Sequence, residues 1–158
     1  MKLAVGSDEQ THLTDTIIEE LNKRGYQVEL FGPLRGVKES WTRVAQQVAE
    51  CVARGEVDGG IVCCWTGTGV SIAANKVPGI RAALCHDAET AKGARLWNRA
   101  NVLCLSLRAT SEIVAKEILD AWFTTPLGTD PVDVECVAQV GEIEKKYQAA
   151  GRKPHVTI

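Results

Sequence analysis

The stretch "CCWTGTGVSIAANK", residues 63–76, joins two cysteines and a tryptophan to a glycine-rich turn and then to a run of small residues. It continues the apolar segment GGIVC at 59–63, which is typical of a strand that is buried on both faces. We therefore expect a strand that passes directly into a helix, which is the unit from which α/β folds are built.

Short apolar runs alternate with helical patterns on both sides of this stretch. We predict strands over 2–7, 26–32, 59–65, 80–85 and 101–106. Such regular alternation predicts a Rossmann-like three-layer α/β/α sandwich with a five-stranded parallel sheet and right-handed crossovers. The 158 residues suit a single domain, which we expect over 1–150, followed by a C-terminal tail at 151–158.

A final apolar stripe follows the break TTPLGTDP at 124–131 and predicts one more helix. This C-terminal helix either packs on the domain or crosses to a partner subunit. Both arrangements bury the stripe, and the spacing alone does not choose between them. The stripe consists of Val132, Cys136, Val140, Ile143 and Tyr147.

Composition excludes several classes of function. The formal net charge is −2, so the chain lacks the basic excess of a nucleic-acid-binding surface. No apolar run approaches the roughly 20 residues that span a bilayer, and the N-terminus turns polar too early for a signal peptide. We expect a cytoplasmic protein with no nucleic-acid partner and no membrane association.

The six cysteines form no C-x-x-C pair, and most lie inside apolar runs. In a reducing compartment such residues are small buried side chains rather than disulfides. Since the three histidines are scattered, we expect no metal site. The cysteines expected in the packed interior are Cys51, Cys63, Cys85, Cys104 and Cys136.

Function is expected at the carboxyl edge of the sheet, because parallel sheets bind ligands outside the carboxyl ends of their strands, where strand order reverses. Several chemically useful residues follow strands at this edge. They are Ser7 and Asp8, then the segment 64–69, then His86 and Asp87, and finally the segment 106–108.

The segment 64–69 combines a thiol with a turn that exposes backbone amides. A Gly-x-Gly turn at a helix start can hold an anion, although the same pattern also fits a merely tight turn. Ile72 replaces the third glycine of a dinucleotide fingerprint, and no Gly-Lys-Ser/Thr closes a P-loop. Cys64 beside a helix N-terminus favours the thiolate, which serves as a base or a nucleophile. Asp8 offers a carboxylate at the same edge or simply caps the first helix.

Three segments carry a resemblance to a known family: GSD at 6–8, TGTGVSIAANKVPGIRAALCHD at 66–87, and AR-WN-ANVL within 94–103. They resemble the type B ribose-5-phosphate isomerase and galactose-6-phosphate isomerase family over roughly residues 1–125. The resemblance implies a divergent aldose–ketose isomerase that acts on a pentose-type sugar or its phosphate. It also implies that no metal or organic cofactor is used, and that a homodimer or tetramer shares active sites between subunits.

The resemblance also implies roles for individual residues. Cys64 matches the base that moves a proton through an enediolate, and Thr66 matches a residue implicated in ring opening. Asp8 matches a sugar-binding residue. Asn98 and Arg108 match a sugar contact and a phosphate-side arginine that reach across a subunit interface. The enediolate oxygens would be held by the backbone amides of Gly67, Thr68, Gly69, Val70 and Ser71.

The chain departs from the family pattern at four places. Trp65 stands where a glycine is usual, Glu9 replaces a phosphate-side histidine, and Trp97 replaces the ring-opening histidine. Residues 129–142 contain no Lys or Arg, where the family has an arginine-rich motif. We still expect Ser7 and Glu9 to contact the substrate.

These departures leave the substrate open. Three tryptophans, Trp41, Trp65 and Trp97, align near the family's pocket, where they stack on a sugar or pack in the core or an interface. The chain is then an isomerase of a sugar phosphate, an isomerase of an unphosphorylated or carboxylated sugar, or a non-catalytic sugar-binding protein. A rebuilt anion clamp would consist of Arg95, Arg99 and Arg108. His86 and Asp87 shuttle protons, or else Asp87 caps a helix and His86 is a satisfied polar side chain.

Overall fold

The computed structural model describes residues 1–149. The tail expected at 151–158 lies outside the described residues. The strands are β1 (Lys2–Ser7), β2 (Gln27–Phe31), β3 (Gly59–Cys64), β4 (Ala82–Leu84) and β5 (Val102–Ser106). The helices are α1 (His12–Lys23), the 3-10 turn η1 (Gly32–Arg35), α2 (Trp41–Ala53), α3 (Thr68–Ala74), α4 (Ala88–Leu96), α5 (Glu112–Thr124) and α6 (Pro131–Ala149).

The five strands form one parallel sheet in the order β2-β1-β3-β5-β4. This confirms the predicted five-stranded α/β sandwich. Strand order reverses between β1 and β3, so the carboxyl ends of these two strands frame the crevice where ligands are expected. β4 is shorter than predicted, because it is the edge strand and its three residues are only partly buried. The side-chain amide of Asn75 bonds the backbone N–H and C=O of Ala82 at 2.9 and 2.8 Å, and so caps its free edge.

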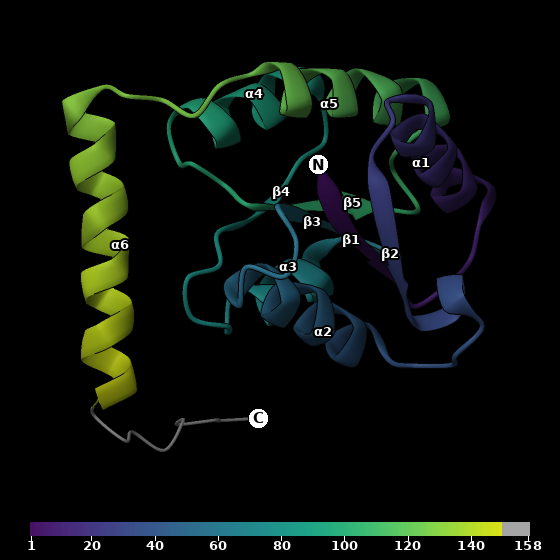
Figure 1. Cartoon of the computed structure of the whole chain (residues 1–158), viewed down its shortest axis with the longest axis horizontal. Helices are drawn as coiled ribbons and strands as arrows, with labels where there is room; N and C mark the ends of the chain where they lie inside the picture. Colours follow the sequence, from purple (N-terminus) through teal and green to yellow (C-terminus); the bar gives the residue numbers. More distant parts are fainter. Residues whose placement is uncertain (150–158) are drawn as a thin grey trace.

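Helices cover both faces of the sheet (Figure 1). The helices α1, α4 and α5 pack on one face and α2 and α3 on the other, and each pair of layers encloses its own hydrophobic core. Alternate residues of β3 therefore enter different cores, and Cys63 faces the first while Cys64 faces the second. Two adjacent thiols thus have unlike surroundings.

Five cysteines are free and buried, and the prediction of burial is confirmed for four of them, Cys51, Cys63, Cys85 and Cys104. Burial raises the pKa of the Cys63 and Cys85 thiols to about 12, so both stay protonated. Cys136 contradicts the prediction, because it is exposed on α6. The reason is that α6 does not pack along the domain.

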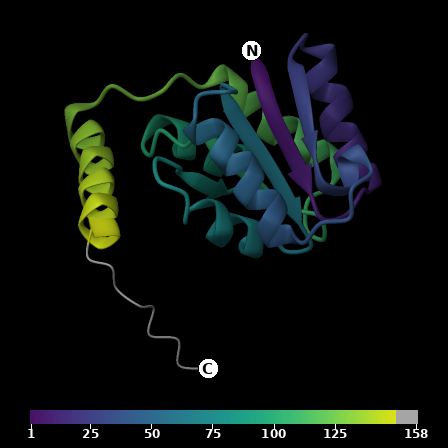
Figure 2. The ribbon, with the colours of Figure 1, turned by 60° about the horizontal axis from the view of Figure 1, so that its bottom comes forward.

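The helix α6 stands apart from the sandwich, at the end of an extended connection (Figures 1 and 2). Both carboxylate oxygens of Glu144 accept the backbone N–H of Gly79 at 3.0 Å, which ties α6 to the loop before β4. The apolar stripe of α6 is largely uncovered, with Val132, Ile143 and Tyr147 each more than half exposed. Within residues 1–149, no helix is both long and apolar enough to cross a bilayer.

Candidate active site

A hollow of about 290 Å³ opens where β3 ends, on the α2 side of the sheet. Cys64 lines this hollow although the residue is only 5% exposed. The residue is therefore shielded from bulk water yet borders an open space. The residues that line the hollow are Asp8, Trp41, Cys64, Trp65, Thr66, Thr68 and Gly69.

Hydrogen bonds from the segment after β5 fix the backbone on either side of this thiol. The amide of Leu107 donates to the carbonyl of Cys64, and the amide of Arg108 donates to that of Trp65, both at 3.0 Å. The hydroxyl of Ser106 donates to the same Trp65 carbonyl at 3.0 Å. The ends of β3 and β5 therefore hold Cys64 in a defined position.

Gly67 makes the turn from β3 into α3. Its φ is +74°, a left-handed conformation that favours glycine. An added Cβ would lie 2.5 Å from Leu84 Cδ1 and 3.0 Å from the carbonyl carbon of Leu105. A larger residue at this position would be strained by the positive φ and would have to displace the Leu84 side chain and crowd the β5 backbone.

Two of the five amides expected to bind an anion are already used. The amide of Gly67 donates to the carbonyl of Cys64, and that of Ser71 donates to the carbonyl of Gly67, both at 3.2 Å. The amides of Thr68, Gly69 and Val70 precede the first hydrogen bond within the helix, so they remain as donors. The expectation of a five-amide ring is therefore reduced to three.

Asp8 follows β1, which is paired with the strand that carries Cys64, and it also lines the hollow. Its Oδ1 atom is buried, with no hydrogen-bond partner among the described residues. Burial raises the pKa of the Asp8 carboxyl, and the nearby charge of Glu9 adds to the effect. An unpartnered buried carboxyl oxygen suits a hydrogen bond to a substrate hydroxyl. The capping alternative does not apply, because Thr11 caps α1.

Ser7 and Glu9 do not line the hollow. Ser7 is fully buried, and its hydroxyl accepts the Glu9 amide at 3.3 Å. Ser7 thus shapes the turn that carries Asp8, which corrects its expected place in direct contact with a substrate. Glu9 is exposed beside this turn.

Two hydroxyls, from Thr66 and Thr68, face each other in the hollow at an Oγ–Oγ distance of 2.6 Å. From the sequence, Thr68 was expected to bind the substrate only through its backbone amide. The Thr-Gly-Thr spacing was the available signal, because a left-handed glycine between two residues can bring their side chains together. Gly67 does so here.

Two of the three tryptophans border this hollow. The Trp41 indole lies over Gly69, where an added Cβ would sit 3.0–3.2 Å from the ring. Gly69 therefore makes room for the indole at the start of α3. Trp65 is 56% exposed, with its backbone bonded to the segment after β5. The interpretation of Trp41 and Trp65 as pocket walls agrees with this placement.

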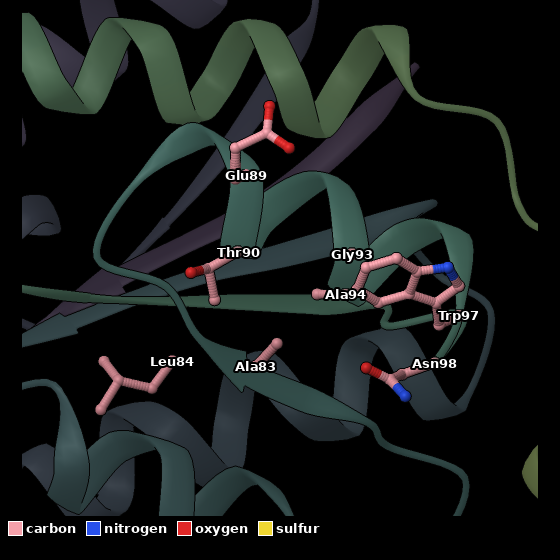
Figure 3. A pocket seen from close by; sticks show the side chains of 8 residues that line it. All are labelled: Ala83, Leu84, Glu89, Thr90, Gly93, Ala94, Trp97 and Asn98. Carbon is pink, nitrogen blue, oxygen red and sulfur yellow. The ribbon is translucent and has the colours of Figure 1, made fainter.

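Trp97 and Asn98 lie elsewhere, in a groove of about 550 Å³ between β4 and α4 (Figure 3). Since α4 runs back across the sheet, its last residues approach the start of β5 rather than the edge that carries Cys64. The Trp97 ring packs over Gly93, where an added Cβ would be 2.6 Å from Cζ3. A single chain therefore does not bring Asn98 to Cys64. The groove is lined by Ala83, Leu84, Glu89, Thr90, Gly93, Ala94, Trp97 and Asn98.

The expected arginine clamp does not form within the chain. Arg95 donates to the carbonyl of Ala100 at 2.6 Å and stacks 5.2 Å from the Trp122 ring centre, so it has a structural role. The Arg99 carbonyl accepts from Arg81 Nε at 3.0 Å near the start of β4. Arg108 is exposed at the edge that carries Cys64.

Asp87 caps α4, since its carboxylate accepts the Thr90 amide at 2.7 Å. This confirms the capping alternative, and the hydrogen bond holds the pKa of Asp87 below its usual range. His86 is exposed beside it. Among residues 1–149, no group of three His, Cys, Asp or Glu side chains converges as a metal site would require.

Comparisons with known proteins relate the chain to one family. Residues 3–135 match the model of the Ribose/Galactose Isomerase family. Ribose-5-phosphate isomerase B of Escherichia coli is 43% identical over 122 residues, which are 77% of this chain and 82% of that protein. D-erythrulose-4-phosphate isomerase of Pectobacterium atrosepticum is 38% identical over 124 residues, 77% of this chain and 82% of that one.

A solved structure agrees over almost the whole chain. Ribose-5-phosphate isomerase B of Clostridium thermocellum superposes with a TM-score of 0.87 at 42% identity, covering 93% of this chain and 99% of that one. The family model spans more than half of the sequence, and the fold is shared with this solved structure. The chain therefore belongs to the ribose/galactose isomerase family, a family of sugar isomerases.

Proposed function

We propose that the chain is an aldose–ketose isomerase that acts on a pentose-type sugar or its phosphate, with Cys64 as the base. One observation carries this proposal: the shielded Cys64 thiol shares a hollow with the Asp8 carboxyl and two threonine hydroxyls. A thiol that acts as a base, next to a carboxyl and hydroxyls that can bind the hydroxyls of a sugar, suits removal of a proton from the carbon adjacent to the sugar's carbonyl group. The names of the relatives, both sugar-phosphate isomerases, support the same reaction class.

In the proposed reaction, the Cys64 thiolate takes the proton from C2 of the open-chain aldose. The resulting enediolate places negative charge on oxygen, which the three remaining amides at the start of α3 stabilise. The thiol then returns the proton to C1, and the ketose forms. Asp8 binds a sugar hydroxyl through its unpartnered oxygen, and Thr66 assists ring opening.

The proposed active site is completed by a second copy of the chain, in a homodimer or a tetramer. Asn98 lies in the α4 groove, away from the thiol of its own chain. The exposed apolar stripe on α6 supplies a surface for such a contact, because this helix stands away from its own domain. Each site would then combine Cys64 of one subunit with Asn98 of the other.

Two classes of substrate remain candidates, and they differ in the group at the end of the sugar remote from the carbonyl. Arg108 is exposed at the correct edge and would hold a phosphate. A second candidate, an unphosphorylated or carboxylated sugar, is favoured by the lining of the Cys64 hollow, which includes two indoles and no Lys or Arg. Indole faces stack well on the C–H faces of a sugar.

The test is a panel of aldoses, uronic acids and aldose phosphates, incubated with the protein in deuterated water. We expect deuterium at the substrate carbon and conversion to the ketose, and the best substrate decides between the two candidates. Cys64→Ala should lower both rates by about 10³-fold or more. Cys63→Ala removes the neighbouring thiol that faces the other core, and should retain most of the activity.

Near-normal exchange in Cys64→Ala would reject Cys64 as the base. Sugar binding by the wild-type protein with neither deuterium uptake nor conversion to ketose would instead identify a non-catalytic sugar-binding protein.

A further inference from the structure

The hydroxyl pair of Thr66 and Thr68 takes no part in the proposed transfer of a proton from C2 to C1 by Cys64. Their oxygens are 2.6 Å apart, which is a short hydrogen bond in which either one donates. Both side chains are exposed to the hollow that contains Cys64. A short hydroxyl–hydroxyl contact in the hollow that Cys64 also lines is therefore available to a bound substrate.

Conversion of an aldose into a ketose moves two hydrogens. One leaves C2 and arrives at C1, which is the transfer proposed for Cys64. The other must leave the hydroxyl oxygen on C2 and arrive at the former carbonyl oxygen on C1. Without this second transfer the enediolate can only return to the aldose from which it came.

A pair of hydroxyls suits the second transfer. A hydroxyl can accept one proton while it donates another, so a proton passes along the pair without creating a new charge. The separation of the two threonine oxygens is also similar to that of two oxygens held cis on adjacent carbons. Each threonine can therefore face one oxygen of the enediolate.

We propose that the Thr66–Thr68 hydroxyl pair relays the proton between O2 and O1 of the enediolate, which makes Thr68 a catalytic residue through its side chain. The proposal rests on the proposed isomerase function. Cys64 takes the C2 proton and leaves an enediolate with its charge on O1. The relay moves the proton from O2 to one threonine, from that threonine to the other, and from there to O1. The thiol then protonates C1 as the C2 carbonyl forms, and every group returns to its starting state.

The test compares two rates in deuterated water, with the panel sugar that the wild-type protein converts fastest. One rate is deuterium uptake at C2 of recovered aldose, and the other is conversion to ketose. Thr68→Val keeps the shape of the side chain and removes the hydroxyl. We expect conversion to fall about 10- to 100-fold, and C2 exchange to fall less than about 3-fold. The ratio of exchange to conversion should therefore rise at least about threefold.

Matched variants separate this role from a structural one. Thr68→Ser keeps a hydroxyl and should restore the wild-type ratio. Thr66→Val should raise the ratio as Thr68→Val does, and it serves as the second variant if Thr68→Val folds poorly. Thr124→Val removes a hydroxyl that bonds the Asp120 carbonyl on α5, far from the hollow, and should leave both rates unchanged.

An unchanged ratio in both valine variants would overturn the relay while leaving Cys64 as the base. Absence of both exchange and conversion in the wild-type protein would overturn the proposed function itself, and the relay with it. The two failures are thus distinguishable.

Discussion

The Cys64 hollow and the α4 groove differ in the chemistry that they gather. The hollow, at the carboxyl ends of β1 and β3, holds a thiol, a carboxyl and two hydroxyls, which all exchange protons. The groove, between the edge strand and α4, holds an indole and an amide, which bind without reacting, together with Glu89 and Thr90 (Figure 3). The chain thus carries these two sets of groups on separate surfaces.

The largest expected effect comes from mixing two inactive proteins. Cys64→Ala removes the proposed base from the hollow and should convert substrate about a thousandfold more slowly than the wild type. Asn98→Ala removes a proposed sugar contact from the groove and should be at least about tenfold slower. If sites are shared, a mixed dimer has one site with both residues intact. After co-refolding at equal amounts, we expect about a quarter of the wild-type activity, because half of the dimers are mixed and each has one good site of two.

Measured conversion before and after mixing checks this prediction. Co-refolding Cys64→Ala with Asp8→Asn serves as the control, because both changes lie in the hollow of one chain and the mixture should stay near its starting rate. Equal recovery in both mixtures would contradict the separation of the two surfaces.

A smaller effect concerns two glycines, one in each region. Gly67→Ala should destabilise the fold by about 1–3 kcal/mol, because the new Cβ meets backbone at Leu105 and φ is +74°. Gly93→Ala meets only the Trp97 ring, which can swing away, so the cost should stay below about 1 kcal/mol. Thermal unfolding measures both, and Gly36→Ala, with φ +81° and open space, isolates the cost of the backbone alone.

If Gly93→Ala lowers the free energy of unfolding as much as Gly67→Ala does, the groove is as rigid as the hollow, and the predicted difference between the two regions is wrong. Binding of the best panel sugar should weaken in Gly93→Ala, since Trp97 leaves its place.

The smallest expected effect is the pH dependence of two aspartates. The pKa of Asp8 is raised by burial, so the folded state holds more protons than the unfolded state, and the ionised form of Asp8 costs stability above its folded pKa. Asp8→Asn should therefore raise the Tm at pH 7 by about 1–2 °C, and the gain should vanish below the unfolded pKa of about 3.9.

Asp87→Asn is the matched control with the opposite sign. The pKa of Asp87 is lowered by the Thr90 hydrogen bond, so its contribution is present above the unfolded pKa and is lost as the pH falls. This variant should lose stability at pH 7 and match the wild type in acid. Tm values measured from pH 3 to 7 check both signs, and a fall in Tm for Asp8→Asn at pH 7 would contradict the burial of that carboxyl.

Much of the fold was predictable because it depends on local patterns. The buried run ending at Cys64 and the similar runs elsewhere are short, apolar and separated by helical patterns, as the strands of α/β folds are. All five strands were therefore found within a few residues of their observed ends. The exposed state of Cys136 was not predictable, because a helical stripe shows that a face is apolar but does not show what covers it.

The candidate site was predictable in part. Cys64, Asp8 and the turn at Gly67 follow strands, and strand ends in a parallel sheet must meet at one edge. The amide count was overestimated, since Gly67 and Ser71 donate inside the protein, and hydrogen-bond partners are set by the path of the backbone. Ser7 looked equally available in the sequence, yet its side chain lies below the turn and is buried.

The sequence by itself determined the order of the strands and helices, the sheet type, and the family, because each of these depends on residue types and their spacing along the chain. Only the tertiary structure decided which groups share a cavity. It joined Thr66 to Thr68, set Trp41 over Gly69, and separated Asn98 from Cys64. The physical reason is that the contacts of a side chain depend on directions in space, which the crossovers, the left-handed turn at Gly67 and the packing of neighbouring helices fix together.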